Sequence, residues 1–136
     1  MRRALVLFAH GARDRQWSAP LRELAQRISA LAPGLAVRTS FLELEPPHLA
    51  DVVNELAASH DYIDILPVFW APAGHVKNEL PRLLAACSAA QPHVEFRTLP
   101  TLSELPGLLE FVAFQALNLS GAGSGRIAAA RPTTVP

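Results

Sequence analysis

Three side chains that can bind a metal ion or accept a proton each follow a separate apolar run of the sequence. They are His10, Glu43 and His75. Imidazole and carboxylate groups bind borderline divalent cations, and imidazole changes its charge near neutral pH. Gly11 and Gly74 stand beside the two histidines, where a residue without a side chain lets a ligand approach the backbone. This set predicts a site that holds a metal ion and takes up protons.

Four apolar runs alternate with four segments of helical periodicity. Strands are expected over 4–9, 36–42, 62–69 and 94–97. The helices between and after them are expected to bury Trp17, Leu21, Leu24, Ala25 and Ile28, then Leu49, Val52, Val53 and Leu56, then Leu80, Leu83, Leu84 and Cys87, and finally Leu105, Leu108, Leu109, Val112 and Leu117. This alternation predicts an α/β fold, a four-stranded parallel sheet with helices on both faces. Ligands of such sheets bind beyond the carboxyl ends of the strands, so the three candidate residues are expected at one rim.

Prolines and a serine suggest where two of these helices begin. Ser18 with Pro20 just behind it predicts the start of the first helix. Pro81 is expected to limit the start of the third helix to about Asn78, because proline breaks a helix interior. Pro67 near the end of the third strand is a flaw in its pattern.

Composition bounds the class of protein. The 136 residues include 12 basic and 12 acidic side chains, so we expect no nucleic-acid partner and no anionic membrane partner. The single cysteine, Cys87, predicts a reducing compartment. The apolar run near the N-terminus is too short for a signal peptide, and a cytoplasmic location is expected. We expect one folded domain over 1–119 and a disordered tail over 120–136, where glycine, alanine and serine dominate.

Several other residues are weaker candidates for a functional role. Solvated surface positions are expected for His48, His60, His93 and Glu45, with His60 also suited to the negative end of a helix. Trp17 is expected to anchor the core, and Cys87 to be buried in it. Trp70 lies in the rim loop, where packing and a role as the wall of a flat aromatic ligand site are both open.

At three blocks the sequence resembles the CbiX/SirB sirohydrochlorin chelatases. The blocks are LVLFAHGARD at 5–14, FLELEPP at 41–47, and LPVF, GHV and ELP within 66–81. The similarity runs over about the first 100 residues and keeps the spacing of the blocks. It implies a class II chelatase fold, half of the two-lobe form, and insertion of Co²⁺ or Fe²⁺ into sirohydrochlorin without ATP. In the family, metal binding and proton transfer lie on residues that match His10, His75 and Glu43.

The resemblance also implies a substrate and a partner. The divalent metal, Co²⁺, Fe²⁺ or Ni²⁺, is a substrate, and no tightly bound cofactor is expected. A sirohydrochlorin-type tetrapyrrole would turn its carboxylates toward Arg13, with Trp70 and Gly74 as further substrate-binding candidates. Short relatives of one lobe are expected to pair as homodimers. Two positions depart from the family pattern, because Ala12 replaces the usual serine and Glu79 the usual aspartate.

Two alternatives belong to other classes of protein. Histidine phosphatases also have a His-Gly pair after a strand, but they need an arginine directly before it, and here that residue is Ala9. A non-catalytic carrier of metal or tetrapyrrole with the chelatase fold is the second alternative, and Ala12 and Glu79 keep it open.

Overall fold

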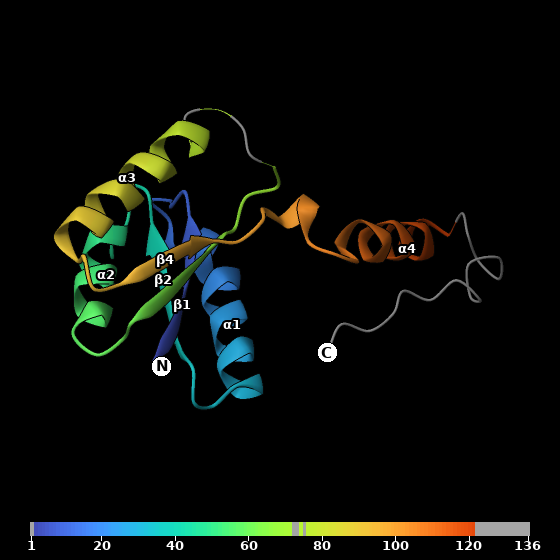
Figure 1. Ribbon diagram of the computed structural model, residues 1–136. Helices are drawn as coiled ribbons and strands as arrows, with labels where there is room; N and C mark the ends of the chain where they lie inside the picture. The colour runs from blue at the N-terminus through green and yellow to red at the C-terminus, as the bar shows by residue number, and fades with distance from the viewer. Residues whose placement is uncertain (1, 72–73, 75, 122–136) are drawn as a thin grey trace.

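The computed structural model describes residues 2–71, 74 and 76–121, and its elements alternate between strand and helix (Figure 1). They are β1 (Arg3–Ala9), α1 (Arg15–Leu31), β2 (Ala36–Phe41), α2 (Leu49–Ala57), β3 (Tyr62–Pro67), α3 (Val76–Ala90), β4 (Glu95–Thr98), the 3₁₀ turn η1 (Leu102–Glu104) and α4 (Leu108–Ser120). No helix in the described part of the chain is both long and apolar enough to cross a bilayer.

The four strands form one parallel sheet in the order β2-β1-β3-β4, which confirms the predicted fold class. β1 lies in the interior of the sheet, where Ala4, Val6, Leu7 and Phe8 are completely buried. A continuous apolar run suits this place, because a central parallel strand is covered on both faces.

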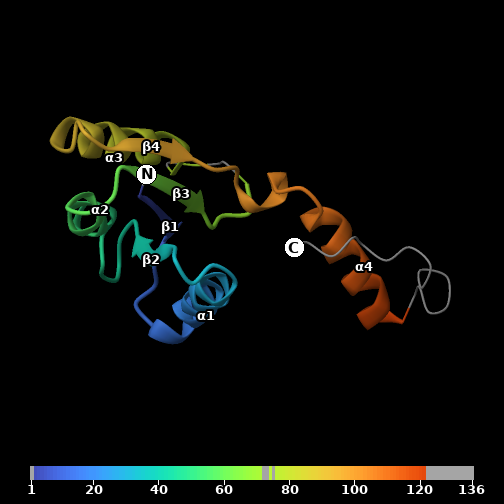
Figure 2. The same cartoon turned by 60° about the horizontal axis from the view of Figure 1, so that its bottom comes forward.

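Helices cover the two faces of the sheet unequally. Figure 2 shows α2 and α3 on one face and α1 on the other. The face under α2 and α3 carries the larger core, which includes Phe8, Ile63 and Ile65. The smaller core, centred on Leu7 and Phe41, lies against α1.

Two helices begin earlier than their prolines predicted. The N-cap of α1 is Asp14, whose side chain accepts a hydrogen bond from the amide of Gln16 at 2.9 Å, so the predicted start at Ser18 is wrong. α3 begins at Val76 rather than near Asn78. In each helix the proline is the sixth residue, at a position where it removes a single backbone hydrogen bond near the helix start.

The predicted inner face of the last helix is wrong. α4 points away from the sheet (Figures 1 and 2), and none of its residues is buried. Its last residue, Ser120, and its cap, Gly121, are the first two residues of the predicted tail. The rest of that tail lies outside the described residues, so the domain boundary stays a prediction.

Candidate functional site

His10 and Glu43 are brought together by an extension of the parallel ladder between β1 and β2. Beyond the strand ends, the amide of Leu42 donates to the carbonyl oxygen of Ala9 at 2.9 Å. The amide of Glu43 then donates to the carbonyl oxygen of His10 at 3.0 Å. The two loops therefore leave the sheet side by side, and their side chains rise from the same rim.

The two side chains meet at this rim. His10 Nε2 lies 3.1 Å from Glu43 Oε1, and the side chains are 42 % and 53 % exposed. The predicted convergence of these two residues is thus confirmed. A half-exposed imidazole beside a carboxylate can share a proton with it, and both groups keep surface through which a metal ion can reach them.

The backbone conformation at position 11 and the close approach of the Glu43 loop require a glycine there. Its φ is +99°, and a Cβ atom at this position would collide with the carbonyl oxygen of Glu43. An L-residue would therefore meet both a left-handed backbone and a steric block. The His-Gly pair is explained by the close approach of two loops, whereas the sequence had suggested the approach of a ligand.

The loop after β2 turns back on itself and closes at its base. Leu44 has a φ of +72°, in the left-handed region that a leucine seldom adopts. The peptide bond between Pro46 and Pro47 is cis. The amide of Phe41 donates to the carbonyl oxygen of Pro47 at 2.9 Å. Glu43 is half-exposed at the rim, whereas the next acidic residue, two positions later, is buried.

That buried residue is Glu45, and its predicted solvated position is wrong. Its side chain is only 5 % exposed. One carboxylate oxygen accepts a hydrogen bond from the amide of Ala12 at 2.8 Å, and the other accepts from Ser18 Oγ at 2.8 Å. Arg22 Nη1 lies 3.8 Å from Glu45 Oε1 and donates a hydrogen bond to Ser18 Oγ at 2.8 Å. Glu45 thus ties the Glu43 loop to the His10 loop and to the start of α1.

Ala12, which replaces the usual serine of the family, contacts Glu45 through its backbone. The bond to Glu45 comes from the backbone amide of Ala12, so any residue except proline could donate it. The hydroxyl that the family usually has at this position is not needed to hold the loop.

The third predicted ligand, His75, lies outside the described residues. Its neighbour Gly74 is exposed with a φ of +64°. Among the described residues no group of three histidine, cysteine or acidic side chains is arranged to hold a metal ion. The described chain therefore shows a two-residue pair, and a site with three ligands stays a prediction.

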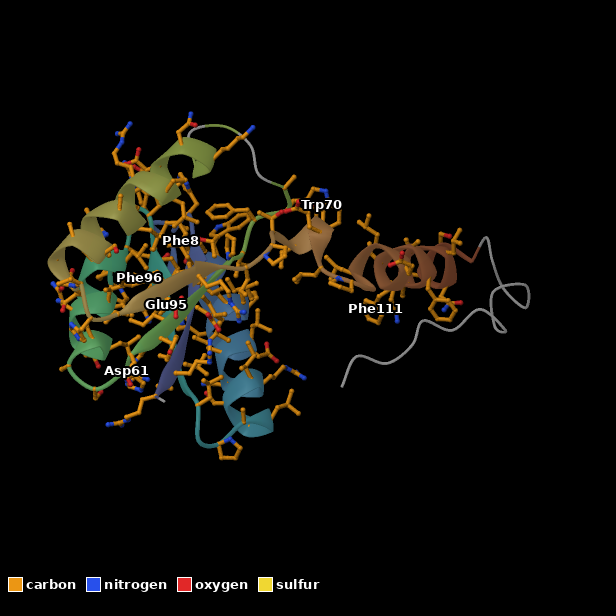
Figure 3. The ribbon with its side chains drawn as sticks, in the orientation of Figure 1. Phe8, Asp61, Trp70, Glu95, Phe96 and Phe111 are labelled. Atoms are coloured by element: carbon orange, nitrogen blue, oxygen red, sulfur yellow. The ribbon has the colours of Figure 1, made fainter. Side chains whose placement is uncertain are left out.

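The predicted substrate-binding residues are open to solvent at this edge. Arg13 is exposed in the loop after His10, and Trp70, labelled in Figure 3, is 56 % exposed beyond β3. The carbonyl oxygen of Trp70 accepts a hydrogen bond from the amide of Ser103 at 2.8 Å, which fixes the backbone beneath the indole. Their exposure leaves both side chains available to a ligand, and their roles stay predictions.

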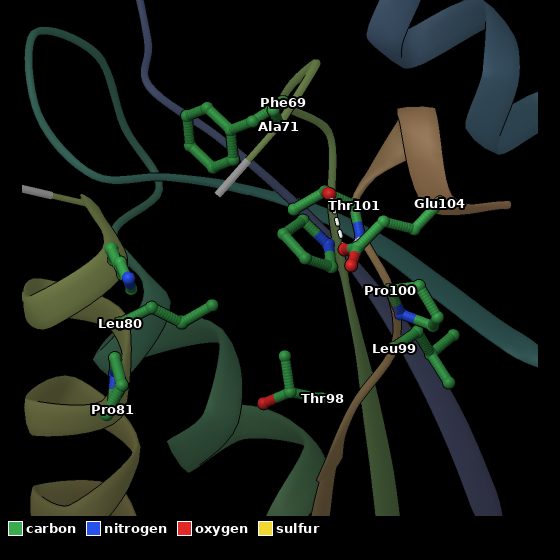
Figure 4. A pocket seen from close by; sticks show the side chains of 11 residues that line it. Phe69, Ala71, Leu80, Pro81, Thr98, Leu99, Pro100, Thr101 and Glu104 are labelled. Atoms are coloured by element: carbon green, nitrogen blue, oxygen red, sulfur yellow. Dashed lines mark hydrogen bonds between the residues drawn. The ribbon is translucent and has the colours of Figure 1, made fainter. Parts of the chain in front are cut away.

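An apolar pocket that the sequence did not indicate lies beyond the ends of β3 and β4 (Figure 4). It has a volume of about 270 Å³, and α3 and η1 contribute to its walls. Phe69 and Leu80 line it, and Lys77, the only lysine of the chain, and Glu104 supply its charged groups. Glu104 is already used, because it accepts hydrogen bonds from the amide and hydroxyl of Thr101 at 3.2 and 2.7 Å.

The remaining histidines serve the scaffold or face solvent. His48 is exposed, as predicted. His60 Nδ1 lies 3.0 Å from the carbonyl oxygen of Leu56 near the end of α2, as expected for a group at the negative end of a helix. His93 is exposed, as predicted, yet its Nε2 lies 2.9 Å from the carbonyl oxygen of Ala57.

Two further predictions concern the core. Cys87 is buried as expected, and burial raises the pKa of its thiol. Trp17 is 79 % exposed on the first turn of α1, so its predicted role as a core anchor is wrong. Trp17 lies on the predicted apolar stripe of α1. The sheet, however, does not cover this end of the helix.

The sequence analysis also did not predict an ion-pair cluster around the buried Asp64 of β3. Asp64 is 8 % exposed and lies between two arginines, with Arg3 Nη1 at 3.3 Å and Arg97 Nη2 at 3.1 Å. The signal was an aspartate inside the apolar run of Tyr62–Pro67, because a carboxylate within a strand requires charged partners on the neighbouring strands.

Solved structures of CbiX and SirB proteins share this fold. A putative cobalamin (vitamin B12) biosynthesis CbiX protein from Marinobacter aquaeolei is 20 % identical, with a TM-score of 0.74, and the match covers 90 % of this chain and 99 % of that one. SirB from Bacillus subtilis with Fe³⁺ is 18 % identical with a TM-score of 0.75, covering 88 % of this chain but 48 % of that one. SirB in complex with cobalt gives the same TM-score and covers 51 % of that chain. The fold is therefore that of one lobe of a chelatase-like protein.

The chain belongs to the CbiX family, whose model matches residues 4–117. The sirohydrochlorin cobaltochelatase of Methanopyrus kandleri is 30 % identical over 82 residues. The match covers 60 % of this chain and 57 % of that protein. The chain thus spans a little over half of this relative and about half of the SirB structures.

Proposed function

We propose that this protein inserts Co²⁺ or Fe²⁺ into a sirohydrochlorin-type tetrapyrrole, as a step of cobalamin or siroheme biosynthesis. Membership of the CbiX family and the activity named for the Methanopyrus relative support this reaction. The observation that carries the proposal is the pairing of His10 and Glu43, 3.1 Å apart at the carboxyl edge of the sheet. Proteins of the same fold have been crystallised with iron and with cobalt, which supports a metal ion as substrate.

The reaction exchanges two protons for one metal ion. The free macrocycle carries two pyrrole N–H groups, and both protons must leave as its nitrogens bind M²⁺. His10 and Glu43, with His75 as a third group, hold the incoming ion and accept these protons. A positioned base contributes about 10²–10⁴-fold to such a step. Holding the ion against the ring contributes further through proximity.

The macrocycle is a flat ring with many carboxylates, and the same edge offers groups to bind it. Arg13 supplies a planar cation suited to carboxylates, and Trp70 an aromatic surface suited to a ring. Gly74, exposed beside His75, is a further substrate-binding candidate. A second copy of the chain completes the site as a homodimer, which agrees with the twofold length of the SirB structures.

The experiment is an insertion assay with purified protein, sirohydrochlorin and each metal ion, Co²⁺, Fe²⁺ and Ni²⁺, followed by the absorbance change of the tetrapyrrole. We expect insertion well above the rate without protein, and a loss of it in His75→Ala. Tight binding of the metallated product without any acceleration would instead identify a carrier. Hydrolysis of an aryl phosphate without metal insertion would instead identify the protein as a phosphatase.

A further inference from the structure

The walls of the apolar pocket beyond β3 and β4 are held in place by contacts within the lobe. Phe69 forms one wall, and its ring centroid lies 5.9 Å from that of Phe8 in the core. Leu80, which is only 6 % exposed, forms the wall on α3 (Figure 4). The segment after β4 is tied to the Phe69 wall, because the amide of Leu102 donates to the carbonyl oxygen of Phe69 at 2.9 Å. A ligand therefore meets a preformed pocket, which lowers the cost of ordering on binding.

The cation of this pocket has no acidic partner in the described part of the chain. Lys77 lies on the first turn of α3 and is exposed, and no described acidic side chain forms an ion pair with it. Glu104, the acidic residue of the pocket, is instead held by the amide and hydroxyl of Thr101. Apolar walls with one available ammonium group suit a ligand that combines an apolar stem with a carboxylate.

The pocket adjoins the loop that carries predicted site residues. Phe69 and Ala71 line the pocket, whereas Trp70 between them is not part of its lining and is 56 % exposed. Lys77 follows His75 by two positions in the sequence. A flat ring that contacts Trp70 from outside is therefore next to the pocket.

The size and position of the pocket fit one part of a tetrapyrrole. Its volume of about 270 Å³ is below the range of about 300–1,000 Å³ typical of pockets that bury a whole ligand. His10 and Glu43 follow β1 and β2, so two strand spacings, about 10 Å, separate this pair from the end of β3 and β4 across the sheet. That span is comparable with the distance from the centre of a tetrapyrrole to the ends of its carboxylate side chains.

We infer that this pocket binds one carboxylate-bearing side chain of the tetrapyrrole. Lys77 pairs with the carboxylate, and Phe69 and Leu80 contact the apolar stem. The inference rests on the substrate of the proposed function, in which the metal ion enters the ring centre beside His10 and Glu43. The pocket fixes the edge of the ring, so Lys77 contributes to the affinity and orientation of the macrocycle and takes no part in proton transfer.

The first test is the affinity for sirohydrochlorin without metal, measured from the fluorescence of the tetrapyrrole during titration with the full chain. Lys77→Met should raise Kd at least about tenfold, because it removes a charge-assisted hydrogen bond. Lys77→Arg keeps a cation and should bind more tightly than Lys77→Met. Arg82→Met is the matched control, because Arg82 is an exposed cation of the same helix that pairs with Glu79 at 3.5 Å and does not line the pocket. It should bind like the parent.

Thr98→Phe tests the pocket without a change of charge. Thr98 is the last residue of β4, is exposed, and lines the pocket on the wall opposite α3. Phenylalanine is well suited to a strand, so the circular dichroism spectrum should not change. Its ring fills space that the substrate side chain needs, and Kd should rise at least about fivefold. Equal Kd values for Lys77→Met and Arg82→Met, or parent-like binding by Thr98→Phe, would overturn the inference.

The insertion assay separates this inference from the proposed function. Lys77→Met should raise KM for sirohydrochlorin and leave KM for Co²⁺ unchanged. Metal insertion by Lys77→Met with the parental KM for sirohydrochlorin refutes only the pocket. A parent that inserts no metal, but whose affinity for sirohydrochlorin falls in Lys77→Met as expected, refutes only the activity.

Discussion

Glu45→Ala tests whether the buried carboxylate holds the two site loops together. The substitution removes acceptors for the amide of Ala12 and the hydroxyl of Ser18, both at 2.8 Å, and leaves Arg22 without its nearby charge. Hydrogen bonds to a charged group contribute about 1.5–3 kcal/mol each, and the two share one network. We therefore expect the free energy of unfolding to fall by about 3 kcal/mol, within the range for breaking a buried pair.

The assay is urea unfolding followed by far-UV circular dichroism. Glu43→Ala is the matched control, because Glu43 is two residues away in the same loop and half-exposed, and its removal should change stability by less than about 1 kcal/mol. Glu45→Gln keeps the shape and loses the charge, so it should lie between the two. Equal stability of Glu45→Ala and Glu43→Ala would refute the anchoring role of Glu45.

Three more predictions concern other parts of the scaffold. Gly11→Ala should lower the free energy of unfolding by at least about 2 kcal/mol, because it introduces backbone strain and a collision with Glu43. A Cβ atom at Gly34 meets open space, so Gly34→Ala should change the free energy little. Chemical denaturation of both variants checks this contrast. Asp64→Ala removes the carboxylate shared by two half-exposed arginines, which water can then solvate, and should lower the free energy of unfolding by about 1–2 kcal/mol, so an unchanged melting temperature would contradict the account. Burial raises the pKa of the Cys87 thiol, so at pH 8 iodoacetamide should modify the folded protein much more slowly than the urea-unfolded chain; equal rates would contradict its burial.

The sheet and the His10–Glu43 pair could be predicted because both depend on strands. A continuous apolar run indicates a strand covered on both faces, and the carboxyl ends of parallel strands share one edge. The ladder beyond β1 and β2 then makes neighbours of residues 33 positions apart in the sequence.

The burial of Glu45 could not be predicted, because it depends on the loop conformation. Leu44 adopts a left-handed φ that no residue type at that position announces, and this turn sends Glu45 inward while Glu43 stays at the rim. The partners that satisfy its charge come from another loop and from α1.

The exposure of Trp17 and α4 escaped prediction for a different reason. An apolar stripe indicates which side of a helix avoids water, but not which surface covers it. In this lobe the sheet does not cover Trp17 on the first turn of α1, and no residue of α4 is buried. The assumption that their own sheet would cover both helices was wrong.

The initial rate of Co²⁺ insertion into sirohydrochlorin by His10→Ala, relative to His93→Gln, tests the central claim most directly. His93 lies at the opposite edge of the sheet, and glutamine can keep a donor near the carbonyl oxygen of Ala57. We predict a loss of at least about a hundredfold in His10→Ala, as expected when a positioned proton acceptor is removed, and a parent-like rate in His93→Gln. Equal rates in the two variants would show that the pair of His10 and Glu43 is not the site of metal insertion.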